Sequence, residues 1–330
     1  MSTKRLEQAA QATKTAFVFP GQGSQKVGML AELAEQFSVV RDTFAEASAA
    51  LGFDLWQIAQ SGEGLDQTEN TQPVLLTASI ALWRVWLELG GIAPKYLAGH
   101  SLGEYSALVA AEAMTLADAV KLVHLRGKLM QSAVPQGTGA MAAILGLADE
   151  KVIELCQKVN ASAAGQGSVE AANYNAQGQV VIAGSTALVQ QVMAEAKEQS
   201  GKAIALPVSV PSHCTLMKPA AEKFAEALEQ TAIELPHLPV IQNVNAEIAT
   251  DVAQLRQALT AQLYQSVQWT RTMQYLQDEG VQYVVECGPG TVLSNLAKRL
   301  PNIEKAFAID SKARMEDALS AILVAEGKIA

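Results

Sequence analysis

Apolar residues along this chain fall into two alternating patterns. Short runs rich in Val, Ile and Phe predict buried strands, and longer stretches with apolar residues three and four apart predict amphipathic helices. Strands are expected at 16–19, 96–98, 207–210, 240–243 and 283–286, and helices at 71–88, 104–113 and 116–130. This alternation predicts an α/β fold with a parallel sheet covered by helices.

The middle of the chain follows a different order. Strands are expected there at 141–145, 169–173, 180–183 and 203–206, and helices at 149–159 and 186–199. The order β-α-β-β-α-β is typical of ferredoxin-like α+β units. We therefore expect a small inserted ferredoxin-like subdomain at 136–206, within a large α/β catalytic subdomain made of 15–135 and 207–330. Residues 1–14 are expected to form a polar tail.

Composition limits the classes of partner. The 330 residues carry a formal net charge of −9 and no basic run interleaved with aromatic residues, which argues against nucleic acid. The apolar stretch at 73–83 is shorter than the roughly 20 residues of a membrane span, and the first 14 residues do not resemble a signal peptide. Three cysteines without metal-like spacing fit reduced thiols. We expect a cytoplasmic protein with no membrane partner and no metal site.

The strongest chemical signal is Gly99-His100-Ser101-Leu102-Gly103. It matches G-x-S-x-G between an expected strand and an expected helix, which is the context of a nucleophile elbow. The glycines leave room for the sharp turn that carries the serine, and the Leu102 N–H can donate to an oxyanion. The motif predicts Ser101 as a nucleophile, with an ordinary strand–turn–helix link as the alternative.

A second glycine-rich loop, Gly21-Gln22-Gly23-Ser24-Gln25, follows the first expected strand. It is not a dinucleotide fingerprint, because the third glycine would fall at Lys26, and no Gly-Lys-Ser/Thr follows. A backbone N–H between glycines could complete an oxyanion hole, or the loop could be a simple tight turn. Together with the elbow, the sequence favours the oxyanion hole.

A serine nucleophile needs a base, and the chain has four histidines. His100 precedes the serine and is expected to point to the opposite side, and His124 is expected on a solvated helix face. His237 lies between prolines in a loop. His213 follows an expected strand, at the sheet edge where ligands gather, so by elimination it is the base. Its neighbour Cys214 is expected to be a buried structural thiol.

Arg126 is the third candidate residue. It lies seven, three and four residues from the apolar Ala119, Val123 and Met130, which places it on the core-facing side of its helix. A buried guanidinium keeps its charge and needs an anion. From periodicity, an internal carboxylate and a substrate carboxylate are equally good partners.

These residues carry a family resemblance. The stretch Gly-His-Ser-Leu-Gly-Glu-Tyr-Ser-Ala-Leu at 99–108 resembles the active-serine signature of the bacterial malonyl-CoA:acyl-carrier-protein transacylases. Further stretches resemble this family in its own order, from about residue 15 to 310: Phe19-Pro20-Gly21-Gln22-Gly23-Ser24-Gln25, Arg126-Gly127-Lys128, Pro211-Ser212-His213, Gln262-Leu263-Tyr264 and Glu286-Cys287-Gly288-Pro289-Gly290. The resemblance implies a hydrolase-like α/β core with a ferredoxin-like insert.

The resemblance also implies roles. Ser101 would form the malonyl ester and His213 would be its base, while the backbone N–H groups of Gln22 and Leu102 would form the oxyanion hole. Arg126 would bind the malonyl carboxylate. Malonyl-CoA would be the substrate with no bound cofactor, and the phosphopantetheine thiol of acyl-carrier protein would accept the malonyl group for fatty acid synthesis.

The resemblance further implies that a backbone carbonyl near Gln262, rather than a carboxylate, orients the histidine. The segment before the histidine reads Val210-Pro211-Ser212, unlike the His-Ala-Phe or Tyr-Ala-Ser of modular polyketide acyltransferase domains. This departure favours a stand-alone transacylase.

Two alternatives remain open. A serine acyl hydrolase, such as a thioesterase, would share the elbow but would need an orienting Asp or Glu and would not need Arg126. A non-catalytic subunit that binds carrier protein could keep the fold, although an intact serine, histidine and arginine set argues against it.

Overall fold

The computed structural model describes residues 13–329 other than 164, 166 and 209. Most of the expected polar tail, residues 1–12, lies outside the described residues. Thr13 and Lys14, also expected in that tail, instead pack with the protein: Thr13 is buried, and the Lys14 carbonyl accepts backbone hydrogen bonds from Gln282 and Tyr283 at 2.8 and 3.1 Å. These two residues therefore extend the first strand toward its neighbour.

Five parallel strands form the larger sheet, in the order β7-β2-β1-β8-β9. Their bounds are β1 Thr15–Phe19, β2 Tyr96–Gly99, β7 Val240–Ile241, β8 Tyr283–Glu286 and β9 Lys305–Ala308. Both faces of the central β1 are buried, with Phe17 and Phe19 in one apolar cluster and Ala16 and Val18 in another. Burial on both faces is typical of a parallel sheet between helical layers, so the expected α/β class is confirmed.

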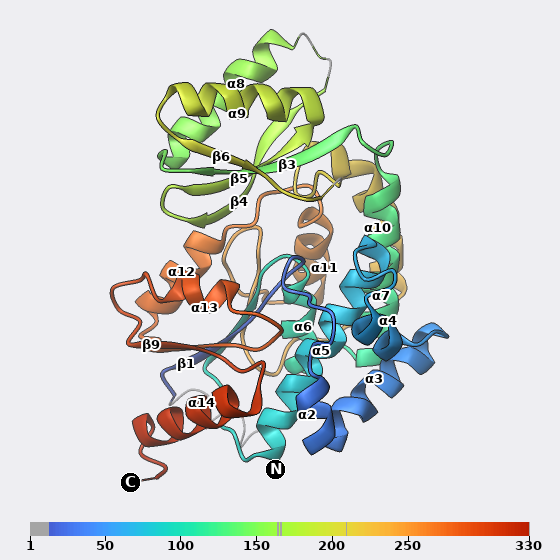
Figure 1. Cartoon of the computed structure of the whole chain (residues 1–330), viewed down its shortest axis with the longest axis vertical. Coiled ribbons are helices and arrows are strands. Elements are labelled where there is room, and N and C mark those ends of the chain that lie inside the picture. Colours follow the sequence, from blue (N-terminus) through green and yellow to red (C-terminus); the bar gives the residue numbers. More distant parts are fainter. Residues whose placement is uncertain (1–12, 164, 166, 209, 330) are drawn as a thin grey trace.

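Helices cover this sheet (Figure 1). Their bounds are α2 Ala31–Gln36, α3 Ser38–Leu51, α4 Leu55–Ser61, α5 Thr68–Glu88, α6 Gly103–Ala110, α7 Leu116–Ser132, α10 Lys218–Gln230, α11 Val252–Ala261, α12 Trp269–Asp278, α13 Val292–Ala297 and α14 Lys312–Ala325, with a 3₁₀ turn at Thr215–Met217. The long α5 packs on β1, where the Phe17 ring lies 5.3 and 5.1 Å from the rings of Trp83 and Trp86. Among the described helices, none has both the length and the apolarity to cross a membrane.

The smaller sheet is antiparallel, in the order β4-β5-β3-β6. Its elements follow one another as β3 Gly139–Leu145, α8 Asp149–Ser162, β4 Val169–Ala176, β5 Gln179–Ser185, α9 Thr186–Glu198 and β6 Lys202–Ala205. This order and pairing are those of a ferredoxin-like unit. Figure 1 shows α8 and α9 on the outer face of this sheet, at the top of the view, and its other face toward the rest of the protein. We propose that residues 136–206 form the smaller subdomain.

Backbone hydrogen bonds join strand β4 of the smaller sheet to the segment just before α12. The Tyr174 N–H on β4 donates to the Val267 carbonyl, and the Val267 N–H donates to the Ala172 carbonyl, each at 2.9 Å. Val267 lies just before α12, in the part of the chain that belongs with the larger sheet. This contact fixes one edge of the smaller sheet beside the carboxyl ends of the larger sheet's strands.

Two expected strands differ in the structure. The prediction of a strand at 207–210 is wrong for the described residues, because Pro207, Val208 and Val210 lie in a loop; Ser209 lies outside the description. The N–H of Val208 turns back to the Leu206 carbonyl at 2.8 Å, and a proline offers no donor to a ladder. Strand β7 has two residues rather than four, because the chain turns at Gln242, whose N–H donates to the Glu247 carbonyl at 2.8 Å.

Candidate active site

Ser101 lies in a sharp turn between β2 and α6, with a left-handed backbone φ of 52°. Both flanking glycines are required by close contacts. A Cβ on Gly99 would lie 1.9 Å from the carbonyl carbon of Gly103, and a Cβ on Gly103 would lie 1.9 Å from the carbonyl oxygen of Phe19. The structure therefore has the strained strand–turn–helix geometry that presents a serine hydroxyl above a sheet.

A buried asparagine holds this turn. The side-chain oxygen of Asn243 accepts the N–H of Ser101 at 2.7 Å, and its Nδ2 donates to the Gly99 carbonyl at 2.6 Å. Asn243 is 1% exposed and directly follows the short β7 region at the carboxyl edge of the sheet. Sequence reasoning missed this residue; a polar residue just after an apolar strand was the available signal.

Ser101 and His213 are within hydrogen-bond distance. The Ser101 Oγ lies 2.8 Å from His213 Nε2, and His213 Nδ1 lies 2.6 Å from the backbone carbonyl of Gln262. Because a carbonyl can only accept, Nδ1 must carry the hydrogen, which leaves Nε2 free to accept the serine proton. The structure thus brings together the predicted nucleophile, base and orienting carbonyl.

The environment of His213 keeps its ring neutral. Burial, and to a smaller extent the positive charge of Arg126, lowers the pKa of His213 to about 3. His213 is 3% exposed, and its backbone, like that of Ser101, is left-handed, with φ 63°. A neutral imidazole near pH 7 is the form that can remove a proton from the serine.

The loop after β1 packs against the elbow. A Cβ on Gly21 would lie 2.6 Å from the His100 carbonyl oxygen, so only glycine allows this approach. Within the described part of the chain, the backbone N–H groups of Gln22 and Leu102 donate no hydrogen bond to the protein. Two free N–H groups beside a serine are the components of an oxyanion hole.

Arg126 is fully buried on α7 beside the serine. Its Nη1 donates to the side-chain oxygen of Gln72 at 2.9 Å, and its Nη2 donates to that of Gln262 at 2.9 Å and to Ser101 Oγ at 3.4 Å. No carboxylate among the residues described lies within ion-pair distance of the guanidinium. The internal salt bridge left open by the sequence is therefore not found, and Gln72 is a partner that sequence reasoning missed.

The other histidines have separate partners. His100 Nε2 lies 2.7 Å from Asn175 Oδ1 on β4, so the ring is turned toward the smaller sheet rather than toward Ser101. The prediction of a solvated His124 is wrong: the ring is half-buried and its Nδ1 lies 2.8 Å from the Glu69 carbonyl. His237 forms an exposed pair with a glutamate. Cys214 is buried, as expected, and its thiol donates to the Pro211 carbonyl.

A cavity of about 310 Å³ opens onto the serine and histidine. Its lining comes from both parts of the protein. Met141 and Asn175 belong to the smaller sheet, and Leu293 and Leu296 belong to α13, a helix beside the larger sheet. Ligand pockets in proteins start at about this volume. The cavity is lined by apolar as well as polar side chains, and it places Ser101 and His213 at its wall.

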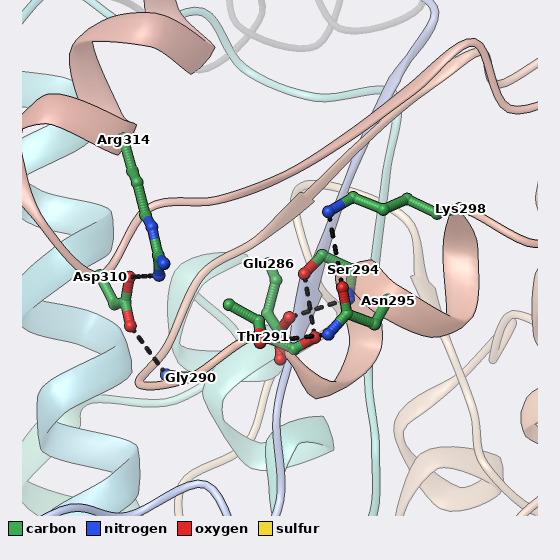
Figure 2. Close-up of polar contacts among 8 residues, drawn as sticks. All are labelled: Glu286, Gly290, Thr291, Ser294, Asn295, Lys298, Asp310 and Arg314. Atoms are coloured by element: carbon green, nitrogen blue, oxygen red, sulfur yellow. Dashed lines mark hydrogen bonds and ion pairs between the residues drawn. The ribbon is translucent and has the colours of Figure 1, made fainter.

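Figure 2 shows how the α13 wall of this cavity is held. The buried Glu286 carboxylate accepts the N–H groups of Leu293 and Ser294 at 3.0 and 2.8 Å, at the start of the helix. Asp310 accepts the N–H of Gly290 at 3.1 Å and pairs with Arg314 at 2.7 Å. A carboxylate at a helix N-terminus is stabilising, so these contacts fix the apolar wall. No cluster of three or more metal-ligating side chains occurs within residues that the structure describes.

Comparison with known proteins agrees with this geometry. Residues 16–315 match the model of the acyl transferase domain family. The chain belongs to the acyl transferase family. Among curated acyl transferases, the malonyl CoA-acyl carrier protein transacylase of Salmonella typhimurium LT2 is 52% identical over 311 residues, covering 93% of this chain and 99% of the relative. That of Bacillus subtilis 168 is 44% identical over 313 residues, covering 94% and 98%.

Solved acyl transferase structures are similar throughout. The crystal structure of FabD from Acinetobacter baumannii has a TM-score of 0.93 and 88% identity, covering 95% of this chain and 99% of that one. A structure described as a type II PKS acyl-carrier protein in complex with its malonyl-transacylase has a TM-score of 0.90 and 49% identity, covering 93% and 99%. At this coverage the likeness includes both sheets.

Proposed function

We propose that this chain transfers the malonyl group of malonyl-CoA to the phosphopantetheine thiol of acyl-carrier protein. One observation carries the proposal: a serine within 2.8 Å of a neutral, oriented histidine lies 3.4 Å from a buried guanidinium that has no carboxylate partner in the described structure. The names of the relatives support the same activity. A reactive hydroxyl beside a cation that no carboxylate contacts directly suits an acyl group that carries its own carboxylate.

In the first half-reaction, Ser101 Oγ attacks the thioester carbonyl while His213 Nε2 takes its proton. The N–H groups of Gln22 and Leu102 donate to the tetrahedral oxyanion, a contribution typically worth 100- to 1000-fold per donor. The oxyanion collapses, the C–S bond breaks, and His213 returns the proton to the departing thiolate of coenzyme A. The product is malonyl-Ser101 with a neutral histidine.

In the second half-reaction, the thiol of the carrier's phosphopantetheine enters the same cavity. His213 takes the thiol proton, the thiolate attacks the malonyl ester, and the serine leaves with the proton from His213. The two steps use one site in turn, so ping-pong kinetics are expected. Partnership with acyl-carrier protein is supported by the related transacylase that was solved in complex with one.

Arg126 selects the acyl group in this proposal. Its guanidinium would bind the malonyl carboxylate through two parallel hydrogen bonds, which acetyl groups cannot form. Gln72 and Gln262 fix its orientation with neutral oxygens, so no resident anion competes directly for the same edge. Selectivity and chemistry thus depend on different residues: Arg126, which is fully buried behind Ser101, and the serine and histidine that line the cavity.

A hydrolase of the triad type is less well supported. Such enzymes orient the histidine with an Asp or Glu, which also stabilises the imidazolium. Here the orienting group of His213 is a backbone carbonyl, and Gln262 supplies it. We further propose that the protein needs no bound cofactor, supplies fatty acid synthesis and works in the cytoplasm, where its three free, buried cysteines would stay reduced.

Intact-mass measurement tests the proposal. Mixing the protein with malonyl-CoA should add one malonyl group, which carrier protein bearing phosphopantetheine should then remove with formation of malonyl-carrier. Ser101→Ala should remain unlabelled in a protein that is still folded. Rapid conversion to free malonate without a lasting adduct would indicate a hydrolase, and no reaction at all would indicate a binding protein.

A further inference from the structure

Arg126 presents an electrostatic problem. A fully buried cation is costly unless an opposite charge compensates it, yet its hydrogen-bond acceptors are two amide oxygens and one hydroxyl. The compensation must come from a charge that does not touch the guanidinium directly.

Glu104 at the start of α6 is that charge. It is 1% exposed, and its Oε2 accepts from Gln262 Nε2 at 2.7 Å and from the Asn243 N–H at 3.2 Å. Its Oε1 is buried and has no hydrogen-bond partner in the described structure. A buried carboxylate with half of its acceptors unused is unusual, and the proposed mechanism gives it no role.

Gln262 lies between the two charges and separates them. Its side-chain oxygen accepts from Arg126, and its Nε2 donates to Glu104 and to the Ser101 carbonyl at 3.0 Å. The opposite amide orientation would place an oxygen against the carboxylate and an N–H against the guanidinium, so the two charges fix the amide in one orientation. The Glu104 carboxylate is therefore separated from Arg126 by the side chain of Gln262. The side of the guanidinium that faces Ser101 has no carboxylate in contact with it.

We propose that Glu104 is the resident counter-charge of Arg126 and that it sets how tightly the site binds a substrate carboxylate. This inference rests on the proposed function. Before substrate binds, the charges of Glu104 and Arg126 then balance each other. A malonyl carboxylate would be a second anion that interacts with the same guanidinium. Removing the resident charge would leave an uncompensated cation that binds the substrate carboxylate more tightly.

The consequence for catalysis follows from the two half-reactions. Binding that stabilises substrate and transition state equally does not speed the chemical step, and excessive affinity would slow release of the malonyl group to the carrier. Glu104 moderates the affinity of Arg126 for a carboxylate without removing the fork of N–H donors that recognises it. It acts as a specificity-determining residue rather than a proton donor.

The test is Glu104→Gln, which keeps an oxygen for Gln262 and Asn243 but removes the charge. The dependence of the rate of Ser101 labelling on malonyl-CoA concentration gives an apparent dissociation constant, with acetyl-CoA as the uncharged comparison. We expect roughly tenfold tighter malonyl-CoA binding, acetyl-CoA binding unchanged within about twofold, and slower transfer to carrier protein. Glu104→Asp, which keeps the charge, should stay near the wild-type value.

Glu112→Gln is the matched control, because this exposed carboxylate lies just beyond α6 and pairs with His237 on the surface. Unchanged or weaker malonyl-CoA binding in Glu104→Gln would overturn the inference, as would an equal change for both acyl groups. If wild-type protein takes up no malonyl group, the proposed function fails instead.

A second measurement needs no variant, in case Glu104→Gln does not fold. Burial raises the pKa of Glu104 to about 7, so lowering the pH from 8 to 6 should neutralise it and tighten malonyl-CoA binding in the wild-type protein. The ionisable groups that interact with Glu104 are Arg126, which stays charged, and Tyr105, whose pKa is raised by burial. Binding that does not tighten as the pH falls would also overturn the inference.

Discussion

The guanidinium of Arg126 donates to the hydroxyl oxygen of Ser101 across 3.4 Å, although the two residues belong to different helix–strand units. The same hydroxyl lies 2.8 Å from His213. In the proposed function, a malonyl ester on Ser101 would have its free carboxylate near this guanidinium. The distance couples the choice of acyl group to the position of the nucleophile.

Loss of Arg126 should change the choice of acyl group, and it should also lower stability because the buried carboxylate of Glu104 loses its compensating charge. Arg126→Ala removes the two hydrogen bonds that only a malonyl carboxylate can accept, so malonyl transfer should fall by several orders of magnitude while acetyl-CoA becomes comparatively better. Arg126→Lys should recover only part of the activity, because an ammonium cannot reproduce the planar fork. Rates with both thioesters, measured on the folded variant, are the deciding measurement; a proportional loss of malonyl and acetyl transfer would contradict the clamp.

Loss of His213 should slow both half-reactions. One imidazole acts as base and then as acid, so His213→Ala should reduce malonyl labelling and transfer to carrier by on the order of 100- to 10,000-fold each, in a folded protein. Because Nδ1 is held by the Gln262 carbonyl, replacing any single Asp or Glu by its amide should have a much smaller effect on rate. An acidic residue whose amide variant matches the histidine loss would revive a hydrolase-type triad.

The pH dependence should lack the usual histidine inflection. Because the pKa of His213 is lowered to about 3, the ring stays in its base form, and the maximal labelling rate at saturating malonyl-CoA should be flat from about pH 5.5 to 8. An ordinary histidine base would instead lose activity as the pH falls through about 6.5. Stopped-flow acylation across this range distinguishes the two, and a fall centred near 6.5 would mean that the ring is much less desolvated than in this structure.

Asn243 should contribute to rate through the elbow. Asn243→Ala leaves the buried N–H of Ser101 and the carbonyl of Gly99 without partners, which should destabilise the protein by about 1–3 kcal/mol and misplace the serine. We expect labelling to slow on the order of 100-fold. Asn245→Ala is a suitable control, because that side chain bonds the surface residue Glu247. Equal effects of the two substitutions on the labelling rate would argue against a positioning role.

The sequence indicated the candidate nucleophile and base, but not the side chains that hydrogen-bond to them and hold them in position. Ser101 follows β2 within a G-x-S-x-G motif, and His213 was selected by elimination among four histidines, although the strand expected before it is a loop. Asn243, Gln72 and Glu104 interact with residues more than 50 positions away or through a third side chain, and only Asn243, a polar residue after an apolar strand, carried a local signal. The orientation of Gln262 likewise depends on two charges from different helices.

The pattern of strands was predicted where burial is complete. Strand β1 is apolar on both faces and was found within one residue of its bounds. Residues 207–210 alternate in the same way as a strand, but the proline lacks a donor and the segment leads from the smaller sheet to the histidine. The conformation of a segment that leads to a site residue depends more on the geometry of the site than on the strand propensity of the segment.

Ser101 and His213 both have left-handed backbones, with φ of 52° and 63°. Any residue with a Cβ loses roughly 1–2 kcal/mol in that conformation, and glycine does not. Glycine would relieve this backbone cost at either position, but at 213 it would also leave the buried Gln262 carbonyl without its donor. The strain at both positions therefore accompanies the side chains themselves, because glycine can supply neither a hydroxyl nor an imidazole.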